Sequence, residues 1–333
     1  MLLVVYGHVS TELDPSICAT HRLFYLIRLP LFFFINGFFA SFPKEIAQGY
    51  FRGKLIKRFR YQFLPTILMW LLFLVVFSIP LKDSILQETK SGFWFVYVAI
   101  QYYLFYVIYY NLIEKRIPSK SIQIFLITGI CIFSQFALGY LNNKNCEAIQ
   151  ILSTLNFLTY LPFFFIGVLC KRYFRQFNRL ISENVVFGGL LVAFIGIYFI
   201  PSNMSFMGKL GGIINLFIYL LHRICGLLIL FRVFQFYSDI FSKKTQVGRA
   251  LTLIGQYTLE IYLIHMFILL SLGLMNLTSL YGWDTLKHVW AFQIIIYGII
   301  TLFICSCCLL IARIVRIVPP LYKLFLGQYE KSI

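Results

Sequence analysis

The side chains best suited to chemistry in this sequence are a histidine and an arginine that stand inside strongly apolar segments. His8 follows Gly7 near the start of the chain, and Arg28 precedes the apolar run that begins at Leu29. An imidazole titrates near neutral pH and can take a proton from a hydroxyl group, as a general base does in acyl transfer. A guanidinium can stabilise an oxyanion or hold an anionic group. The structural alternatives are a histidine that hydrogen-bonds between helices and an arginine that snorkels to the membrane surface.

A cluster of bases precedes a later apolar run. Six lysines and arginines occur between Lys44 and Arg60, and the cluster closes at Pro65. Such a cluster can bind phosphates, either of anionic lipid headgroups or of a nucleotide-bearing donor, and it can equally serve only as a topology anchor. The candidate cofactor-binding residues are Lys54, Lys57, Arg58 and Arg60.

Further polar side chains fall inside apolar segments, where an unpaired one is costly, so each is a candidate for substrate binding. Asn36 offers an interhelical hydrogen bond. For His222 and Arg223 there are two alternatives, in which they line a cavity or belong to a structural polar network. Glu260 and His265 stand on one segment about 140° apart around a helix axis, so we do not expect them to pair with each other. The alternative for Glu260 is a solvated position near the membrane interface.

These residues are carried by a chain that must meet lipid. Of its 333 residues, 60% are hydrophobic and 12% are charged, with a mean hydropathy of +0.83. Soluble domains carry about twice that charged fraction. The net charge is +17, but the bases lie in short clusters between long apolar runs, which is typical of membrane-facing loops. We therefore expect membrane lipids as partners and no nucleic acid.

The apolar runs predict an all-α integral membrane protein with about ten transmembrane helices, forming a single domain over residues 1–333. A segment of about 20 apolar residues is long enough to cross a bilayer. Nine windows meet this length, at residues 24–41, 63–81, 93–113, 121–142, 148–170, 184–201, 212–236, 250–275 and 288–312. The opening stretch, residues 1–9, would rise only ~13 Å as a helix. We expect it to be a truncated first span, or a first span inside which the start codon has been placed.

The connectors between these windows alternate between base-rich and base-poor. Clusters of lysine and arginine stay on the cytoplasmic side of a membrane. The alternation places both termini in the cytoplasm and predicts a multi-pass protein of the bacterial cytoplasmic (inner) membrane. His8 and Arg28 then lie toward the outer ends of adjacent spans, while the bases up to Arg60 face the cytoplasm.

The eight cysteines do not predict a metal site. Most lie within or at the edges of apolar runs, and Cys305 with Cys308 has CxxC spacing but lacks a second pair. Cys18 and Cys146 lie in polar connectors, and a disulfide between them stays open. We expect no bound metal.

The order of several motifs resembles the membrane acyltransferase 3 family, which includes bacterial O-acetyltransferases of surface polysaccharides and fucose 4-O-acetylase-like proteins. The matching stretches, in chain order, are Val4–His8, Leu29–Phe38, the basic stretch ending at Pro65, Trp94–Phe95, Leu161–Gly167 and Gly255–His265. They cover nearly the whole chain, and the number of spans agrees with that of the family.

The resemblance implies an enzyme that moves an acyl group, usually acetyl, from a cytoplasmic acyl-CoA to a carbohydrate hydroxyl at the outer face. It implies that His8 is the leading catalytic residue and that Arg58 and its neighbours serve the donor. Acetyl-CoA would be the donor substrate, and a carbohydrate or a lipid-linked glycan the acceptor. The main alternative is a transporter or flippase of a lipid-linked saccharide, although the chain lacks the two related halves that such proteins often have.

Overall fold

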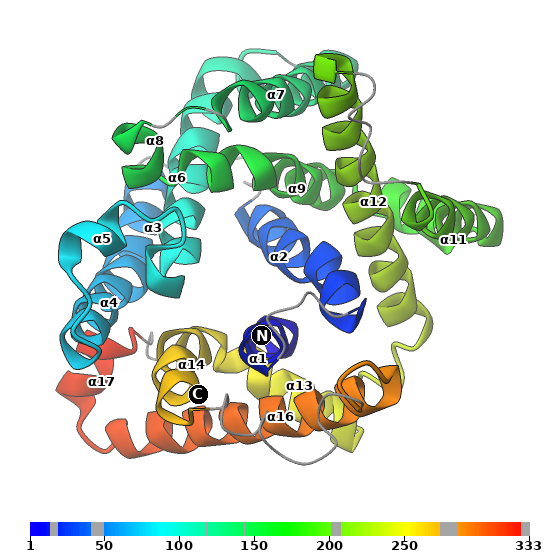
Figure 1. Cartoon of the computed structure of the whole chain (residues 1–333). Coiled ribbons are helices and arrows are strands. Elements are labelled where there is room, and N and C mark those ends of the chain that lie inside the picture. The colour runs from blue at the N-terminus through cyan, green and yellow to red at the C-terminus, as the bar shows by residue number, and fades with distance from the viewer. Residues whose placement is uncertain are drawn as a thin grey trace. The chain divides into compact units, whose positions relative to one another are not determined.

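The computed structural model describes residues 1–13, 19–40, 50–117, 119–142, 144, 146–200, 208–273 and 286–327, and these residues form helices and no strand. The longer helices are labelled in Figure 1. In chain order the helices are α1 (Leu2–Leu13), α2 (Ala19–Ala40), α3 (Tyr50–Arg58), the π-helix η1 (Phe59–Phe63), α4 (Leu64–Val76), α5 (Leu81–Ile85), η2 (Lys90–Gly92), α6 (Trp94–Tyr109), the π-helix η3 (Tyr110–Glu114), α7 (Lys120–Leu141), α8 (Glu147–Ile151), α9 (Thr154–Arg172), α10 (Phe174–Ser182), α11 (Asn184–Tyr198), α12 (Gly208–Phe236), α13 (Gln246–Gln256), α14 (Thr258–Ser271), α16 (Trp290–Val315) and α17 (Pro319–Phe325).

Within the described ranges, seven helices are long and apolar enough to cross a membrane, and two bent helix pairs raise the number to nine if each pair is one span. The bent pairs are α10 with α11, at 76°, and α13 with α14, at 79°. These nine segments correspond to the nine predicted windows, so the all-α membrane class is confirmed. Helix α1 has 12 residues and rises about 18 Å, which is short of the hydrocarbon thickness.

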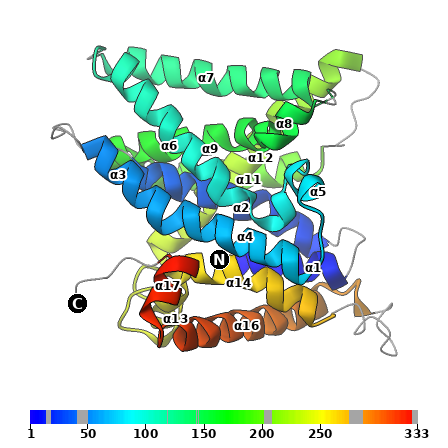
Figure 2. The same ribbon diagram turned by 90° about the vertical axis from the view of Figure 1, so that its left-hand side faces the viewer.

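The third spanning segment begins earlier than its apolar window predicts. Residues Tyr50–Val76 form one continuous helix of 27 residues, which Figure 2 shows as α3 running into α4. The described part of the basic cluster is therefore helical and not a connector. The π-helix η1 lies just before Pro65, which has no backbone N–H to donate. Gly327, near the end of the described chain and at φ +67°, packs against the carbonyl oxygen of Tyr61 in η1. A side chain at position 327 would overlap that oxygen.

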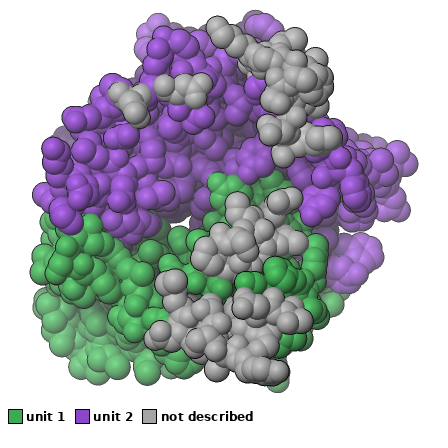
Figure 3. Space-filling model, in the orientation of Figure 1, with its two compact units in different colours: residues 1–28, 56–79, 238–333 green, residues 29–55, 80–237 purple. Residues whose placement is uncertain are grey.

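The chain folds into two compact units (Figure 3). Unit 1 consists of residues 1–28, 56–79 and 238–333, and unit 2 of residues 29–55 and 80–237. The long helix α2 contributes its first part to unit 1 and its second part to unit 2. That the chain forms one domain stays a prediction.

In unit 1, helix α1 packs against α14 and α16 (Figure 1). A buried chain of hydrogen bonds fixes this packing. The hydroxyl of Tyr6 on α1 donates to the Thr20 hydroxyl at 3.0 Å, and Thr20 donates to Oε1 of Gln293 on α16 at 2.8 Å. Interhelical hydrogen bonds of this kind hold membrane helices in register. Helix α1, which carries His8, is thereby tied to two neighbouring helices.

In unit 2, two helices meet at a pair of glycines. A side chain at Gly37 of α2 would overlap the carbonyl of Phe164, and one at Gly167 of α9 would overlap the carbonyl of Phe34. Glycine allows such close approach of backbones between membrane helices. Pro30 lies inside α2, which continues through it as one helix. Around this crossing, an aromatic core includes the fully buried Tyr102.

The connector before α6 is held by a buried lysine. Lys90 Nζ donates to the carbonyl oxygens of Ile85 at 2.7 Å, Gln87 at 2.8 Å and Gln150 at 2.6 Å. Burial lowers the pKa of Lys90 to about 8. The ammonium group at neutral pH therefore still has three N–H donors for its three acceptors.

The cysteines described by the structure are free thiols, and Cys146 is exposed. Cys18, the other cysteine of the open disulfide prediction, lies outside the described residues, as does Lys44 of the basic cluster.

Candidate active site

The candidate catalytic residue His8 lies on α1 next to a second histidine. The rings of His8 and His265 have centroids 5.3 Å apart and planes inclined by 45°. His8 is partly exposed, and among the described residues its ring makes no hydrogen bond. His265 on α14 is 1% exposed. The structure thus pairs an accessible imidazole with a fully buried one.

Arg28 lies over the backbone of the residue that precedes His8. A methyl group at Gly7 would overlap Nη1 of Arg28, so the absence of a side chain at Gly7 makes room for the guanidinium. The Arg28 guanidinium carbon also lies 5.2 Å from the ring centre of Tyr25. Arg28 is buried at 9% exposure, so it packs against α1 instead of extending away as a snorkelling arginine does. His8 is within electrostatic range of Arg28 and His265.

The sequence reasoning missed a third histidine at this site. His21 on α2 stacks on Tyr25 with ring centroids 5.9 Å apart, and its Nδ1 is 2.6 Å from the hydroxyl of Ser10. Burial, followed by the charge of Arg28, lowers the pKa of His21. The signal was present, because His21, Tyr25 and Arg28 have the spacing i, i+4, i+7 that defines one face of a helix.

Ser10 joins α1 to α2 through His21. Its hydroxyl lies 2.6 Å from Nδ1 of His21 and 2.9 Å from the carbonyl oxygen of Gly7. These contacts position α2 against α1 beside His8.

Glu260 lies at the start of α14 and is not solvated. It is 1% exposed, and its Oε1 accepts a hydrogen bond from the hydroxyl of Tyr322 on α17 at 2.9 Å. Burial, followed by the Glu260 carboxylate, raises the pKa of Tyr322, which keeps the donor protonated. The alternative that placed Glu260 in water is wrong, because its carboxylate is buried and meets the hydroxyl of Tyr322. As the helix geometry predicts, Glu260 and His265 contact different partners.

The candidate phosphate-binding residues lie along the helix that enters the third span. Lys54, Lys57 and Arg58 belong to α3, and Arg60 belongs to η1. Residues 54, 57 and 58 have the spacing i, i+3, i+4 and share one helix face. Lys57 and Arg60 are exposed.

The other candidate substrate-binding residues belong to unit 2. His222 and Arg223 are buried on α12, at 6% and 3% exposure. The ring of His222 lies 4.4 Å from that of Phe194 between centroids, and the Arg223 guanidinium lies 4.1 Å from the ring centre of Tyr219. Asn36 on α2 is partly exposed.

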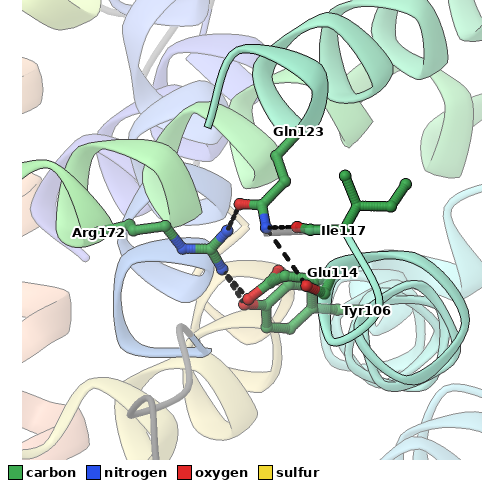
Figure 4. Close-up of polar contacts among 5 residues, drawn as sticks. All are labelled: Tyr106, Glu114, Ile117, Gln123 and Arg172. Carbon is green, nitrogen blue, oxygen red and sulfur yellow. Dashed lines mark hydrogen bonds and ion pairs between the residues drawn. The ribbon is translucent and has the colours of Figure 1, made fainter. Parts of the chain in front are cut away.

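Unit 2 also holds a polar cluster that the sequence reasoning did not single out (Figure 4). Arg172, in the last turn of α9, forms an ion pair with Glu114 at the end of η3 and donates to the Tyr106 hydroxyl at 3.1 Å and to Oε1 of Gln123 at 3.1 Å. Gln123 on α7 in turn donates to the carbonyl of Ile117 at 2.6 Å. Arg172 thereby joins α9 to η3 and to α7, while Oε2 of Glu114 is buried without a hydrogen bond among the described residues.

An accessible imidazole, a guanidinium held beside it and a buried second imidazole are a set of groups suited to moving a proton and stabilising a developing negative charge. With the helices described above, they define a multi-pass α-helical membrane protein with a candidate acid–base site in its first unit. A family model described as an acyltransferase domain matches residues 1–317, and the chain belongs to this acyltransferase 3 family. It is a membrane acyltransferase. No curated protein and no solved structure matches the chain.

Proposed function

We propose that the chain transfers an acyl group, with acetyl the first candidate, from acyl-CoA on the cytoplasmic side to a hydroxyl of a cell-surface carbohydrate. The observation that carries the proposal is the partly exposed His8, which has a guanidinium packed against the adjacent backbone. This combination supplies a base for the hydroxyl and a positive charge for the oxyanion that forms when a thioester carbonyl is attacked.

In the proposed reaction, a ring nitrogen of His8 takes the proton of the acceptor hydroxyl. The hydroxyl oxygen forms a bond to the acyl carbon, the carbon–sulfur bond of the thioester breaks, and the His8 imidazolium returns the proton to the departing thiolate. Arg28 stabilises the oxyanion between these two events. In the relay form of the mechanism, a ring nitrogen of His8 forms a bond to the acyl carbon, the carbon–sulfur bond breaks, and the thiolate leaves with the other ring proton of His8. The acceptor hydroxyl oxygen then forms a bond to the acyl carbon, the carbon–nitrogen bond to His8 breaks, and the hydroxyl proton passes to the ring.

The donor would be held by the bases of α3 and η1. A CoA molecule carries several phosphate groups, which lysine and arginine bind through charge-assisted hydrogen bonds. Support comes from the shared helix face of Lys54, Lys57 and Arg58 and from the exposure of Arg60. If the base-rich connectors lie on the cytoplasmic side of a bacterial inner membrane, this helix face meets the compartment that contains acyl-CoA.

The acceptor would be a carbohydrate or a lipid-linked glycan. Asn36, His222 and Arg223 are proposed substrate-binding residues. His222 and Arg223 lie against aromatic rings, and such a setting suits sugars, which present both hydroxyls and apolar faces. Glu260 takes its proposed part indirectly, by holding the start of α14, which also carries His265.

The deciding experiment measures label transfer from radioactive acetyl-CoA to surface glycan in membranes that contain the wild-type chain, His8→Ala, Arg28→Gln or a combined Lys57→Gln/Arg58→Gln variant. We expect His8→Ala to reduce transfer at least about 100-fold. The double variant should mainly raise the KM for acetyl-CoA, because it removes phosphate contacts. Transfer that survives in His8→Ala would contradict the mechanism. Wild-type membranes that contain the protein but transfer no label would favour a flippase for a lipid-linked saccharide.

A further inference from the structure

The protonation of the buried His265 ring is fixed by its own helix. Its Nδ1 lies 2.9 Å from the carbonyl oxygen of Ile261 and 2.8 Å from that of Tyr262. Carbonyl oxygens only accept hydrogen bonds, so Nδ1 carries a proton. In the neutral ring, the other nitrogen, Nε2, then holds a lone pair and acts as an acceptor.

This acceptor is buried without a partner. Nε2 of His265 makes no hydrogen bond in the part of the chain that the structure describes. Buried polar atoms are nearly always hydrogen-bonded, so an orphan at such a position calls for an explanation. The ring of His8 lies against this residue, with its centroid 5.3 Å from that of His265. A hydrogen bond of ordinary length between two imidazole nitrogens places the ring centres about 5 Å apart, so the two rings are close enough for such a bond although the structure does not form it.

We propose that His265 is the positioning residue for His8: when the substrates are bound, its Nε2 accepts the N–H of one His8 nitrogen and leaves the lone pair of the other His8 nitrogen open to the acceptor hydroxyl. This inference rests on the proposed function. Arg28 cannot take this part because a guanidinium has no lone pair with which to accept a hydrogen bond. His265 has no contact with substrate in this scheme.

The pair also accounts for the charge that appears on His8. When His8 removes the hydroxyl proton it becomes an imidazolium, and its second N–H remains directed to the neutral Nε2 of His265. A hydrogen bond from a cationic donor to a buried acceptor is stronger than one between neutral groups, so the interaction grows as the transition state is approached. The proton leaves with the departing thiolate, and His265 returns unchanged.

Three substitutions of His265 distinguish a hydrogen-bond acceptor for His8 from a side chain that only binds its own helix backbone. His265→Gln keeps an acceptor at the reach of Nε2, His265→Asn keeps only a donor at the reach of Nδ1, and His265→Leu removes both. We expect His265→Asn and His265→Leu to lower kcat about 100-fold with little change in the KM of either substrate, and His265→Gln to recover a substantial part of that loss. If His265→Asn equals or exceeds His265→Gln in kcat, the ring acts only as an anchor and the proposal is wrong.

A spectroscopic measurement tests the pair without relying on turnover. In ¹⁵N-histidine-labelled protein in lipid, the His8 ring signals are identified by their loss in His8→Gln. His265→Leu should shift these signals, and His288→Gln, at an exposed position before α16, should leave them in place. Unchanged His8 signals in His265→Leu would overturn the pairing while leaving acyl transfer intact. If His265→Leu shifts the His8 signals while the wild-type protein transfers no acyl group, the pairing is supported and the proposed function is refuted.

Discussion

At the scale of single residues, the site depends on a position that has no side chain. Gly7 leaves space over the α1 backbone, and the guanidinium of Arg28 fills it. A cation held beside the residue before the proposed catalytic histidine needs no reorganisation when a negative charge develops, which is how preorganised donors lower a barrier. Glycine in a helix costs roughly 1 kcal/mol relative to alanine. Its presence here is explained by the neighbour it admits.

Gly7→Ala should therefore disable the site without unfolding the chain. The added methyl group displaces the end of a flexible arginine side chain and leaves the backbone in place, while alanine favours the helix. We expect acyl transfer to fall about 100-fold, with the melting temperature unchanged or raised.

Gly298→Ala is the matched control, because a methyl group at this position of α16 meets nothing within 4 Å. It should transfer acyl groups within about twofold of the wild-type rate, the size of change expected where no transition-state contact is altered. Full activity in Gly7→Ala would show that Arg28 has no part in the chemistry.

At the scale of helices, Arg172 has a structural role. It lies in the last turn of α9, where a cation is favoured by the helix dipole, and its guanidinium joins η3 and α7 through Glu114 and Gln123. The connector between η3 and α7 is thereby held to α9, as the dashed contacts in Figure 4 show.

Removing one member of this ion pair should destabilise unit 2. Arg172→Met leaves the partly buried Glu114 carboxylate without its cation, and we expect a cost of about 2 kcal/mol, below the value for a fully buried pair because both groups retain some exposure. Thermal unfolding in detergent measures the loss. The double variant Arg172→Met/Glu114→Gln should lose less than the sum of the single variants.

Arg175→Met serves as the comparison, since Arg175 is an exposed arginine in the adjacent helix α10. This substitution should change the free energy of unfolding by no more than about 0.5 kcal/mol. Equal destabilisation by both arginine variants would mean that the ion pair contributes nothing specific.

At the scale of the whole molecule, the charge pattern predicts which connectors face which side. The connector after α7 is base-poor and contains the exposed Cys146, whereas the connector before α13 contains Lys243 and Lys244. The two connectors are separated by an odd number of predicted spans. They should therefore lie on opposite sides of the membrane.

Thiol labelling tests this orientation. In a Cys18→Ser background, Cys146 should react with a membrane-impermeant maleimide in intact cells. In a Cys146→Ser/Lys243→Cys variant of the same background, the new thiol should react only after permeabilisation. Equal labelling of both in intact cells would refute the alternation and, with it, the cytoplasmic position of the bases that are proposed to bind the donor.

The nine spanning segments and the candidates His8 and Arg28 follow from the sequence. The hydropathy of each residue reflects its cost of transfer to lipid, so apolar segments and the polar residues within them can be identified directly. The boundary of the third span did not follow, since the bases from Lys54 to Arg60 read as a loop although their helix is continuous. A polar sequence can extend a membrane helix where it leaves the lipid.

The partners of these residues were decided only by the tertiary structure. Nothing in the spacing joins His8 to His265, Arg28 to the backbone of Gly7, or Glu260 to Tyr322. Hydropathy states which segments enter the membrane, but it does not state which faces of these helices meet. That choice depends on close packing at small residues and on a few buried hydrogen bonds, and these exist only once helices distant in the chain lie against one another.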